Sequence, residues 1–487
     1  MRIMIVAPEA KPFARNGGLA EVIHGLAWAL VRQGHQVTVV TPYYRQTQNC
    51  SWPISSTGKR LNIVMSVKTL TAEIYQIQVH PNLQGFFIGQ DSLYNRDGLY
   101  GTPYGDYEDN AERFIFLSRA VPEMIKDLEL DIDVCHCHEW HTGLIPAYLK
   151  TLYQDVPRIS QISTLYTVHN VGWQGIFPHY DMPLTGLGWE FFNTKTMEFY
   201  GKINLMKTGL VFADLISTVS ETYRQEILTP EYGNGLEGVF QERAQDFYGV
   251  LNGVDYDIWD PAHDNLIAAS FSPSQPAGKK ICKADLAKYF ELEIPEEQPL
   301  IGMTTRLTER KGIELVRDLM EDLMNLKVAF VIQATGEERY QYFFNEFQQR
   351  HPHQMGVRIG YAEELAHKII AGADIFLMPS RYEPCGLDQL YCLRYGTIPV
   401  VRATGGLDET IQDYDPQRQT GTGFKFYDYR AAELWGAIKR ALALYQDQIA
   451  WKQLMKQAMA QNFSWDKSVQ KYLELYAKAK QKKSPSQ

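Results

Sequence analysis

The chain has 487 residues, enough for two or three domains that each bury a core of their own. Its formal net charge of −9 argues against nucleic acid or an anionic membrane as the main partner, and no apolar run is long enough to cross a membrane. Six cysteines in a chain of this length do not predict a disulfide framework, so we expect a protein of the cytoplasm.

The first 42 residues predict one strand–helix–strand unit. Residues 3–6 form an apolar strand, Gly17-Gly18 opens a helix with apolar residues at helical spacing, and Gly34 ends it. Residues 36–41 then predict a second strand. Apolar strands that alternate with amphipathic helices are typical of a parallel sheet covered on both faces.

The same alternation restarts near residue 300, after a segment at 260–278 that is rich in proline and serine. Strands, each followed by a helix, are expected at 300–304, 328–334, 357–360, 375–378 and 398–401. The fold class is therefore α/β, with two Rossmann-like, doubly wound parallel-sheet domains. Because such sheets bind ligands at the carboxyl ends of their strands, we expect the two domains to face a deep cleft, the architecture called GT-B.

Two glycine-containing loops carry cations. Arg15 precedes Gly17-Gly18, where free backbone N–H groups and the positive end of a helix favour an anion. Arg306 and Lys311 follow the first strand of the second block, and Gly312 opens the next helix. A diphosphate leaving group needs cations where no metal is present, so these two side chains are candidates for a phosphate clamp. A solvated surface role is the alternative for each cation.

The segment from 134 to 141 is rich in cysteine and histidine and raises the question of a zinc site. If its first residues form a strand, the two cysteines face one side and the two histidines the other, so they cannot close one tetrahedral site. His141 follows the strand end and is expected to donate a hydrogen bond to a substrate. His169 and Asn170 open a polar loop after another strand, a position that favours function over a structural role.

Residues 379–407 combine a carboxylate, a helix, a short strand and a Gly-Gly turn. Glu383 lies at the start of the helix, and an ionised carboxylate only accepts hydrogen bonds, which suits sugar hydroxyl groups. Gly405-Gly406 follows the strand at 398–401, where bare backbone N–H groups are able to approach a phosphate. A sugar and a phosphate held together indicate a nucleotide-sugar site.

These motifs, in this order, resemble those of bacterial glycogen synthases and plant starch synthases, the enzymes of glycosyltransferase family 5. The resemblance runs from Met1 to about Tyr476. The segments that carry it are 15–22, 138–141, 166–178, 249–255, 305–312, 359–361 and 379–407.

The resemblance implies a retaining hexosyltransferase that transfers glucose from ADP-glucose to the non-reducing 4-OH of an α-1,4-glucan, either glycogen or a maltooligosaccharide. We expect an acceptor-side domain at 1–255, a nucleotide-sugar-binding domain at 256–463, a helix at 464–480 that packs back on the first domain, and a frayed tail at 481–487. No cofactor and no metal are expected, and neither nucleic acid nor a membrane is an expected partner. The sequence does not indicate an oligomeric state.

The resemblance also implies roles for individual residues. Arg306 and Lys311 hold the diphosphate, Glu383 binds the donor glucose, and His141 supports an oxocarbenium-like transition state. The other residues expected to bind donor or acceptor are Arg15, Gly17, Gly18, Glu21, His169, Asn170, Asn252, Gly360, Tyr361, Cys385, Gly386, Leu387, Thr404, Gly405 and Gly406.

Two residues depart from the family pattern at the first loop. Arg15 stands where the family has lysine, and Glu21 stands where it usually has aspartate. A planar guanidinium is not a neutral exchange for an ammonium group at a tight site. The alternatives are therefore a GT-B glycosyltransferase with an altered donor, such as UDP-glucose, or an altered acceptor, and a weakly active paralogue that binds glucan.

Overall fold

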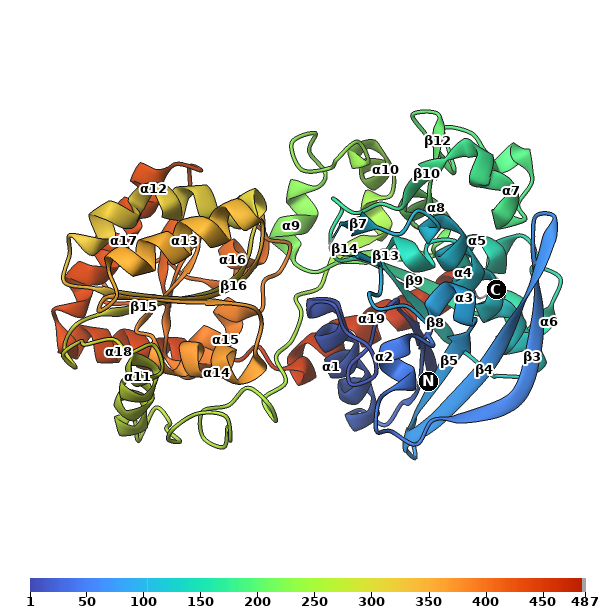
Figure 1. Ribbon diagram of the computed structural model, residues 1–487. Helices are drawn as coiled ribbons and strands as arrows, with labels where there is room; N and C mark the ends of the chain where they lie inside the picture. Colours follow the sequence, from blue (N-terminus) through green and yellow to red (C-terminus); the bar gives the residue numbers. More distant parts are fainter. Residues whose placement is uncertain (103, 484–487) are drawn as a thin grey trace. The chain divides into compact units, whose positions relative to one another are not determined.

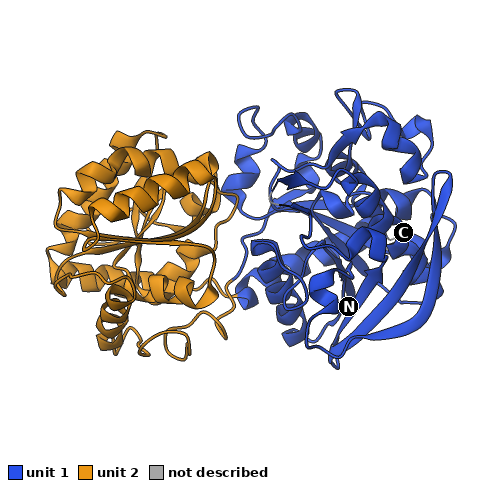
Figure 2. Cartoon of the chain, viewed as in Figure 1, with its two compact units in different colours: residues 1–253, 465–487 blue, residues 254–464 orange. Residues whose placement is uncertain are grey.

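The computed structural model describes residues 1–102 and 104–483 and divides into two compact units (Figure 1, Figure 2). Unit 1 comprises Met1–Gly253 and Trp465–Gln487, and unit 2 comprises Val254–Ser464. The expected domain boundaries after residues 255 and 463 lie within two residues of these divisions.

In the described part of the chain, unit 1 is built on a nine-stranded sheet in the order β14-β13-β9-β8-β1-β2-β5-β4-β3. The strands are β1 (Arg2–Val6), β2 (Gln36–Pro42), β3 (Ser55–Met65), β4 (Lys68–His80), β5 (Leu83–Gly89), β8 (Val134–His138), β9 (Ser163–Val168), β13 (Leu215–Thr218) and β14 (Phe247–Gly249). The pairs from β14 to β5 are parallel, as expected. The antiparallel β3–β4 edge was not expected from the sequence; in β3 exposed and buried residues alternate near its end, which is typical of a strand with one face in water.

The other elements of unit 1 surround this sheet. Its helices are α1 (Gly18–Arg32), α2 (Arg45–Gln48), α3 (Asp91–Tyr94), α4 (Asn110–Asp127), α5 (Ile145–Lys150), α6 (Pro157–Ser160), α7 (Met182–Thr185), α8 (Leu205–Phe212), α9 (Glu221–Glu226), α10 (Glu237–Glu242) and α19 (Trp465–Lys483). Two small sheets contain β6 (Gly101–Thr102) with β7 (Gly105–Asp106), and β10 (Ile176–Pro178) with β12 (Lys202–Asn204) and β11 (Glu198–Phe199).

Unit 2 has a sheet in which every pair of neighbouring strands is parallel, in the order β17-β16-β15-β18-β19-β20. The strands are β15 (Leu300–Leu307), β16 (Ala329–Gly336), β17 (Met355–Ile359), β18 (Ile375–Met378), β19 (Ile398–Arg402) and β20 (Phe424–Phe426). The helices are α11 (Ala277–Tyr289), α12 (Ile313–Met324), α13 (Glu338–Arg350), α14 (Glu363–Gly372), α15 (Asp388–Tyr395), α16 (Gly405–Thr410), α17 (Ala431–Tyr445) and α18 (Gln448–Met459). Helices α12, α13, α16 and α17 cover one face of the sheet, and α11, α14, α15 and α18 cover the other (Figure 1). The five strands predicted between 300 and 401 are therefore present, and unit 2 is doubly wound.

Helix α19 belongs to unit 1, where it lies against α1 and β9 (Figure 1). Its buried residues Trp465, Val469 and Tyr472 join the same core cluster as the apolar face of α1. The helix continues to Lys483, three residues past the predicted end at 480. The Lys483 ammonium donates to the Ile162 carbonyl at 2.5 Å. Residues 484–487 of the expected tail lie outside the described residues. Among the helices that are described, none is both long and apolar enough to cross a bilayer.

The contact between α1 and α19 yields a stability prediction. A Cβ at Gly25 would lie 1.9 Å from the Trp465 indole nitrogen, so Gly25→Ala must displace that ring. We expect a loss of about 1–3 kcal/mol of unfolding free energy. Gly238→Ala is the matched control, because no atom lies within 4 Å of a Cβ there and alanine favours its helix, α10. Urea unfolding followed by tryptophan fluorescence checks both variants; equal midpoints would contradict this packing.

Candidate functional site

The predicted site residues follow the carboxyl ends of neighbouring strands in each unit. In unit 1 all of them except Asn252 follow β1, β8 and β9, which are adjacent in the sheet. In unit 2 all of them except Arg306, Gly360 and Tyr361 follow β15, β18 and β19, which are also adjacent. Each unit therefore gathers one set of polar side chains at one edge of its sheet, the position where doubly wound sheets bind ligands.

A buried ion pair is the centre of the set in unit 2. The Lys311 ammonium lies 2.5 Å from a Glu383 carboxylate oxygen, and the Ser380 hydroxyl donates to the same oxygen at 3.0 Å. Burial alone would raise the pKa of Glu383, but the charges of Lys311 and Arg310 outweigh it and hold that pKa below its usual value. Glu383 is therefore ionised at neutral pH and accepts hydrogen bonds only.

Backbone contacts place Lys311 beside Glu383. Gly312 has a φ of 71°. A Cβ there would lie 2.0 Å from the Pro379 carbonyl oxygen, so only glycine fits. The Arg381 N–H also donates to the Arg310 carbonyl at 2.8 Å. The loop after β15 is thus fastened to the loop after β18, and the two charges face each other as a result.

The Gly405-Gly406 turn packs against the backbone next to Glu383. Gly405 has a φ of 46°, and a Cβ there would lie 2.0 Å from the Glu383 carbonyl oxygen. The Gly406 N–H donates to the carbonyls of Glu383 and Pro384, at 3.1 and 3.2 Å. The expectation of bare N–H groups at this turn is therefore wrong for Gly406, whose amide is occupied. The glycines are needed here because two backbones approach closely; Thr404, just before them, is buried.

Helix α15 begins close to Glu383 and brings in a carboxylate that the sequence did not single out. Cys385 is buried, Gly386 has a φ of 69°, and Leu387 precedes the first helical residue, Asp388. The Thr304 hydroxyl donates to Asp388 at 3.3 Å. Burial, with the nearby charge of Glu383, raises the pKa of Asp388 to about 6 although Lys311 opposes the shift. Lys311 thus has two carboxylates near it.

Three further predicted residues of unit 2 lie at the same edge of the sheet. Arg306 is exposed on β15. Gly360 and Tyr361 follow β17, which β16 separates from β15, and the Tyr361 side chain is 59% exposed. An exposed ring at a sheet edge is able to stack on a flat ligand group.

In unit 1 the loop after β1 surrounds a carboxylate of its own. Glu9 is buried and accepts hydrogen bonds from the backbone N–H groups of Asn16 and Gly17, the latter at 3.2 Å. The amides expected to bind a ligand anion before Gly18 are therefore filled by Glu9, which corrects that part of the prediction. The reason is charge: a buried carboxylate needs donors, and this loop supplies them.

The two residues that depart from the family pattern contact each other. The Arg15 guanidinium lies 3.5 Å from a Glu21 carboxylate oxygen, and the Lys11 ammonium lies 3.2 Å from the same oxygen. All three side chains are partly exposed. Arg15 and Glu21 thus belong to one ion cluster at the start of α1.

The loops after β8 and β9 are joined by a second buried carboxylate, Glu139. It accepts hydrogen bonds from the backbone N–H groups of His169 and Asn170, at 2.6 and 3.0 Å, and it has a positive φ of 66°. Burial raises the pKa of Glu139 to about 8 in spite of these donors. The Asn170 side chain accepts from the Gly172 N–H at 2.9 Å, which shapes the following turn.

The histidines of β8 alternate with its cysteines as predicted. The sulfur atoms of Cys135 and Cys137 lie 3.7 Å apart on one side, and the rings of His136 and His138 lie 4.0 Å apart on the other. The His138 ring shares a hydrogen bond of 2.9 Å with His169, and burial lowers the pKa of His169 to about 3. Within the residues the structure describes, no group of three or more His, Cys, Asp or Glu side chains is arranged to hold a metal ion.

Two predicted residues of unit 1 have buried polar atoms without a partner in the described structure. The Nδ1 atom of His141 is one, and the Asn252 side-chain oxygen is the other. The His141 ring is stacked on Trp140 at 3.8 Å, and burial holds the pKa of His141 well below its usual value, so the imidazole is neutral. Asn252 follows β14, which is an outermost strand of the sheet. Unpaired buried polar atoms are costly unless a ligand pairs with them.

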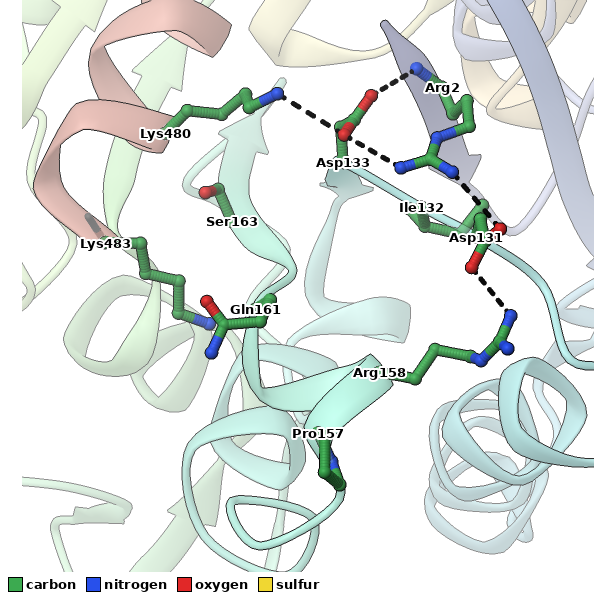
Figure 3. A pocket seen from close by; sticks show the side chains of 10 residues that line it. All are labelled: Arg2, Asp131, Ile132, Asp133, Pro157, Arg158, Gln161, Ser163, Lys480 and Lys483. Atoms are coloured by element: carbon green, nitrogen blue, oxygen red, sulfur yellow. Dashed lines mark hydrogen bonds and ion pairs between the residues drawn. The ribbon is translucent and has the colours of Figure 1, made fainter. Parts of the chain in front are cut away.

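A cavity of about 400 Å³ in unit 1 is not part of this set. It lies at the amino ends of β1, β8 and β9, whereas the predicted site residues follow the carboxyl ends of these strands. Figure 3 shows that its charged side chains pair with each other: Asp133 contacts Arg2 and Lys480, and Asp131 contacts Arg2 and Arg158. The cavity is therefore lined by a structural ion network.

Sequence reasoning missed three carboxylates of the site: Glu9, Glu139 and Asp388. Glu9 and Glu139 lie in loops that follow strands β1 and β8, and Asp388 is the first residue of helix α15. Glu139 directly follows β8. For Glu9 and Glu139, the sequence offered a signal: each is a carboxylate that follows the carboxyl end of a buried strand.

Comparisons with known proteins agree over the whole chain. Residues 2–242 match the starch synthase catalytic domain family, and residues 287–458 match the glycosyl transferases group 1 family. The chain is 43% identical to a glycogen synthase from Koribacter versatilis (strain Ellin345), over 100% of this chain and 99% of that protein. It is also 43% identical to a glycogen synthase from Geotalea daltonii (strain DSM 22248 / JCM 15807 / FRC-32), over 98% of each.

Two solved structures are also similar to this chain over nearly its whole length. The catalytic domain of starch synthase IV from Arabidopsis thaliana, bound to ADP and acarbose, is 30% identical, with a TM-score of 0.92 over 99% of both chains. A sucrose-phosphate synthase from Thermosynechococcus elongatus, 16% identical with a TM-score of 0.60 over 98% of both chains, shares the fold alone.

Glu139 makes stability depend on pH. Its folded pKa of about 8 lies above its ordinary value of 4.5, so the folded state holds the proton more tightly than the unfolded state. Its contribution to stability is full below about pH 4.5 and is lost as the pH rises through about 8. Glu139→Gln should therefore flatten the fall of the urea midpoint between these pH values.

The control for this measurement is Glu231→Gln, which changes an exposed carboxylate of the same unit. It should leave the pH profile as in the original chain. If Glu139→Gln also leaves the profile unchanged, Glu139 is ionised at neutral pH and the burial argument fails.

Proposed function

The chain belongs to the family of bacterial glycogen synthases and plant starch synthases, glycosyltransferase family 5, and on that premise we propose how its residues perform the family reaction. It has the two-domain α/β fold of the GT-B type and is a glycosyltransferase that transfers glucose from ADP-glucose. In our proposal the acceptor is the non-reducing 4-OH of an α-1,4-glucan, glycogen or a maltooligosaccharide, and the anomeric configuration is retained. The starch synthase structure bound to ADP and acarbose supports a nucleotide and a glucan as ligands.

The observation that carries the proposal is the buried Lys311–Glu383 pair. Glu383, ionised and with one oxygen on Lys311 and Ser380, has a second oxygen able to accept from glucose hydroxyl groups. Lys311 and Arg306 then supply positive charge for the diphosphate as it leaves, which lowers the barrier to glycosidic cleavage.

Unit 1 supplies neutral hydrogen-bonding groups. His141 is uncharged, and its buried Nδ1 atom has no partner in the described structure, so it is suited to bond the donor glucose. The Asn252 side-chain oxygen is likewise suited to accept from a sugar hydroxyl. Neutral groups near the sugar avoid repelling the positive charge that develops on it in the transition state.

We also propose that the reaction needs no metal ion or cofactor. Arg306 and Lys311 provide the cations that a diphosphate requires; Arg306 lies near the end of β15, and Lys311 follows that strand. The described residues offer no cluster of metal ligands for a divalent cation in their place.

The experiment that tests the function measures incorporation of labelled glucose into glycogen. We expect label from ADP-glucose to enter polymer that α-amylase digests, in EDTA as well as without it. Label from UDP-glucose should enter much more slowly. Glucan binding without incorporation would instead favour the weakly active paralogue, and loss of activity in EDTA would contradict the metal-free proposal.

Removal of either charge of the buried pair should abolish most turnover. Lys311→Ala and Glu383→Gln should each lower kcat by about 100- to 1000-fold, because a cation or acceptor that acts in the transition state is lost. Lys280→Ala, which breaks an exposed ion pair with Glu296 in the same unit, should have full activity. Circular dichroism verifies that the variants are folded; near-original kcat in both would refute these roles.

The ion cluster at the first loop should couple Arg15 to Glu21. Arg15→Lys and Glu21→Asp each shorten one partner of a contact that is already 3.5 Å long, so each alone should raise the KM for ADP-glucose. The double variant should be less impaired than the sum, with a coupling of about 0.5–3 kcal/mol. Steady-state kinetics with ADP-glucose and UDP-glucose measure it. Strictly additive effects would mean that the two departures are independent.

A further inference from the structure

A cavity in unit 1 has more positive than negative charge along its walls. It measures about 400 Å³ and lies at the amino ends of β1, β8 and β9, so we call it the amino-end cavity. Among the described residues, four cations and two carboxylates line it: Arg2, Arg158, Lys480, Lys483, Asp131 and Asp133. The ion pairs between them therefore leave an excess of two positive charges.

Lys483 is the cation that these ion pairs leave out. Its ammonium group donates to the uncharged Ile162 carbonyl at 2.5 Å. Asp214, whose charge also acts on Lys483, is already paired with Lys150 at 2.8 Å. Burial accordingly lowers the pKa of Lys483, as is expected of an ammonium group that has lost hydration without gaining a full counter-charge. An anion in the cavity would supply that charge.

A buried hydroxyl group also lines the amino-end cavity. Ser163, the first residue of β9, is only 1% exposed. Its backbone N–H donates to the Asp133 carbonyl at 3.1 Å, but its hydroxyl has no hydrogen-bond partner among the described residues. In Figure 3 the Ser163 side chain lies between those of Lys480 and Lys483, which are three residues apart on α19. A buried hydroxyl without a partner is costly, so a ligand that accepts its hydrogen bond is favoured.

The excess charge and the hydroxyl donor together select the ligand. A phosphate monoester carries about −1.5 to −2 charges at neutral pH and has three acceptor oxygens. It therefore matches both the excess of two positive charges and the Ser163 hydroxyl, whereas a carboxylate would neutralise only half of that excess. The cavity volume lies within the range of small-molecule sites, about 300–1,000 Å³, which argues for a small ester rather than a polymer.

We propose that the amino-end cavity is a binding site for a small phosphate monoester, with Lys480, Lys483 and Ser163 as the groups that hold its phosphate. The site is separate from the predicted donor residues, because those of unit 1 follow the carboxyl ends of the same strands. The inference goes beyond the proposed function and does not depend on it. A bound ester would join α19 to β9 and stabilise unit 1, since a ligand that binds only the folded state raises its stability.

Isothermal titration calorimetry with glycerol 2-phosphate tests the site. Lys483→Gln should raise the Kd at least about tenfold, because a hydrogen bond from a charged donor is lost, and Ser163→Ala should raise it about two- to tenfold. Lys195→Gln is the matched control, because it removes the same charge from an exposed position of unit 1 that does not line the cavity. Its Kd should equal that of the original chain.

A second variant separates this site from the proposed diphosphate site of unit 2. Lys311→Ala should leave the Kd of the amino-end cavity unchanged. Binding that is lost in Lys311→Ala but equal in Lys483→Gln and Ser163→Ala would place the phosphate at the donor residues and overturn the proposal. So would the same Kd in all variants, or no binding by the original chain.

Two further measurements complete the test. Inorganic phosphate should bind more weakly than the ester, because the cavity has room beyond one phosphate group; equal affinity would mean that the free ion is the occupant and would overturn the assignment to an ester. Glucose transfer measured without phosphate should be unchanged in Lys483→Gln and Ser163→Ala, and a loss of transfer in both would tie the cavity to catalysis and contradict a separate site. Ser163→Ala removes a single oxygen atom, so it keeps the test valid if Lys483→Gln loosens the end of α19.

Discussion

The contact on which the site in unit 2 depends is the buried ion pair of Lys311 and Glu383. A carboxylate taken out of water is costly unless a cation and hydrogen-bond donors meet it. Here Lys311 and Ser380 meet one oxygen of Glu383. The pair exists only because two glycine-containing loops approach to within contact of the same backbone, Gly312 at Pro379 and Gly405 at Glu383. The Lys311–Glu383 ion pair therefore depends on the close backbone packing of Gly312 and Gly405.

Unit 1 buries carboxylates by other means. Glu9 is met by backbone amides at the start of α1, while Glu139 has amide donors and a pKa of about 8. Burial favours the neutral form of both Glu139 and His141, since a charged group loses its hydration there. Unit 2 thus holds a buried pair of fixed charges, and unit 1 buries groups whose neutral forms are favoured.

The sequence predicted the strands of unit 2 well because each is an apolar run buried on both faces, and such runs are bounded by polar loops. It singled out Lys311 as a candidate phosphate ligand because Lys311 follows a predicted strand, and Glu383 as a candidate sugar ligand because Glu383 stands at the start of a predicted helix. It did not predict the β3–β4 edge, where only one face is buried and the apolar signal is weaker. It also missed Asp388, because a carboxylate in the first turn of a helix is an ordinary feature of exposed helices.

What the sequence determined by itself is the order of the elements and the family, since these follow from local patterns and motif spacing. Only the tertiary structure decided how those loops meet. It placed the Glu9 carboxylate on amides that the sequence left for a ligand, and it filled the Gly406 amide with the Glu383 and Pro384 carbonyls. It also joined Arg15 to Glu21 in one ion cluster. The reason is that hydrogen bonds and ion pairs between loops depend on distances in space, which residue spacing along the chain does not specify.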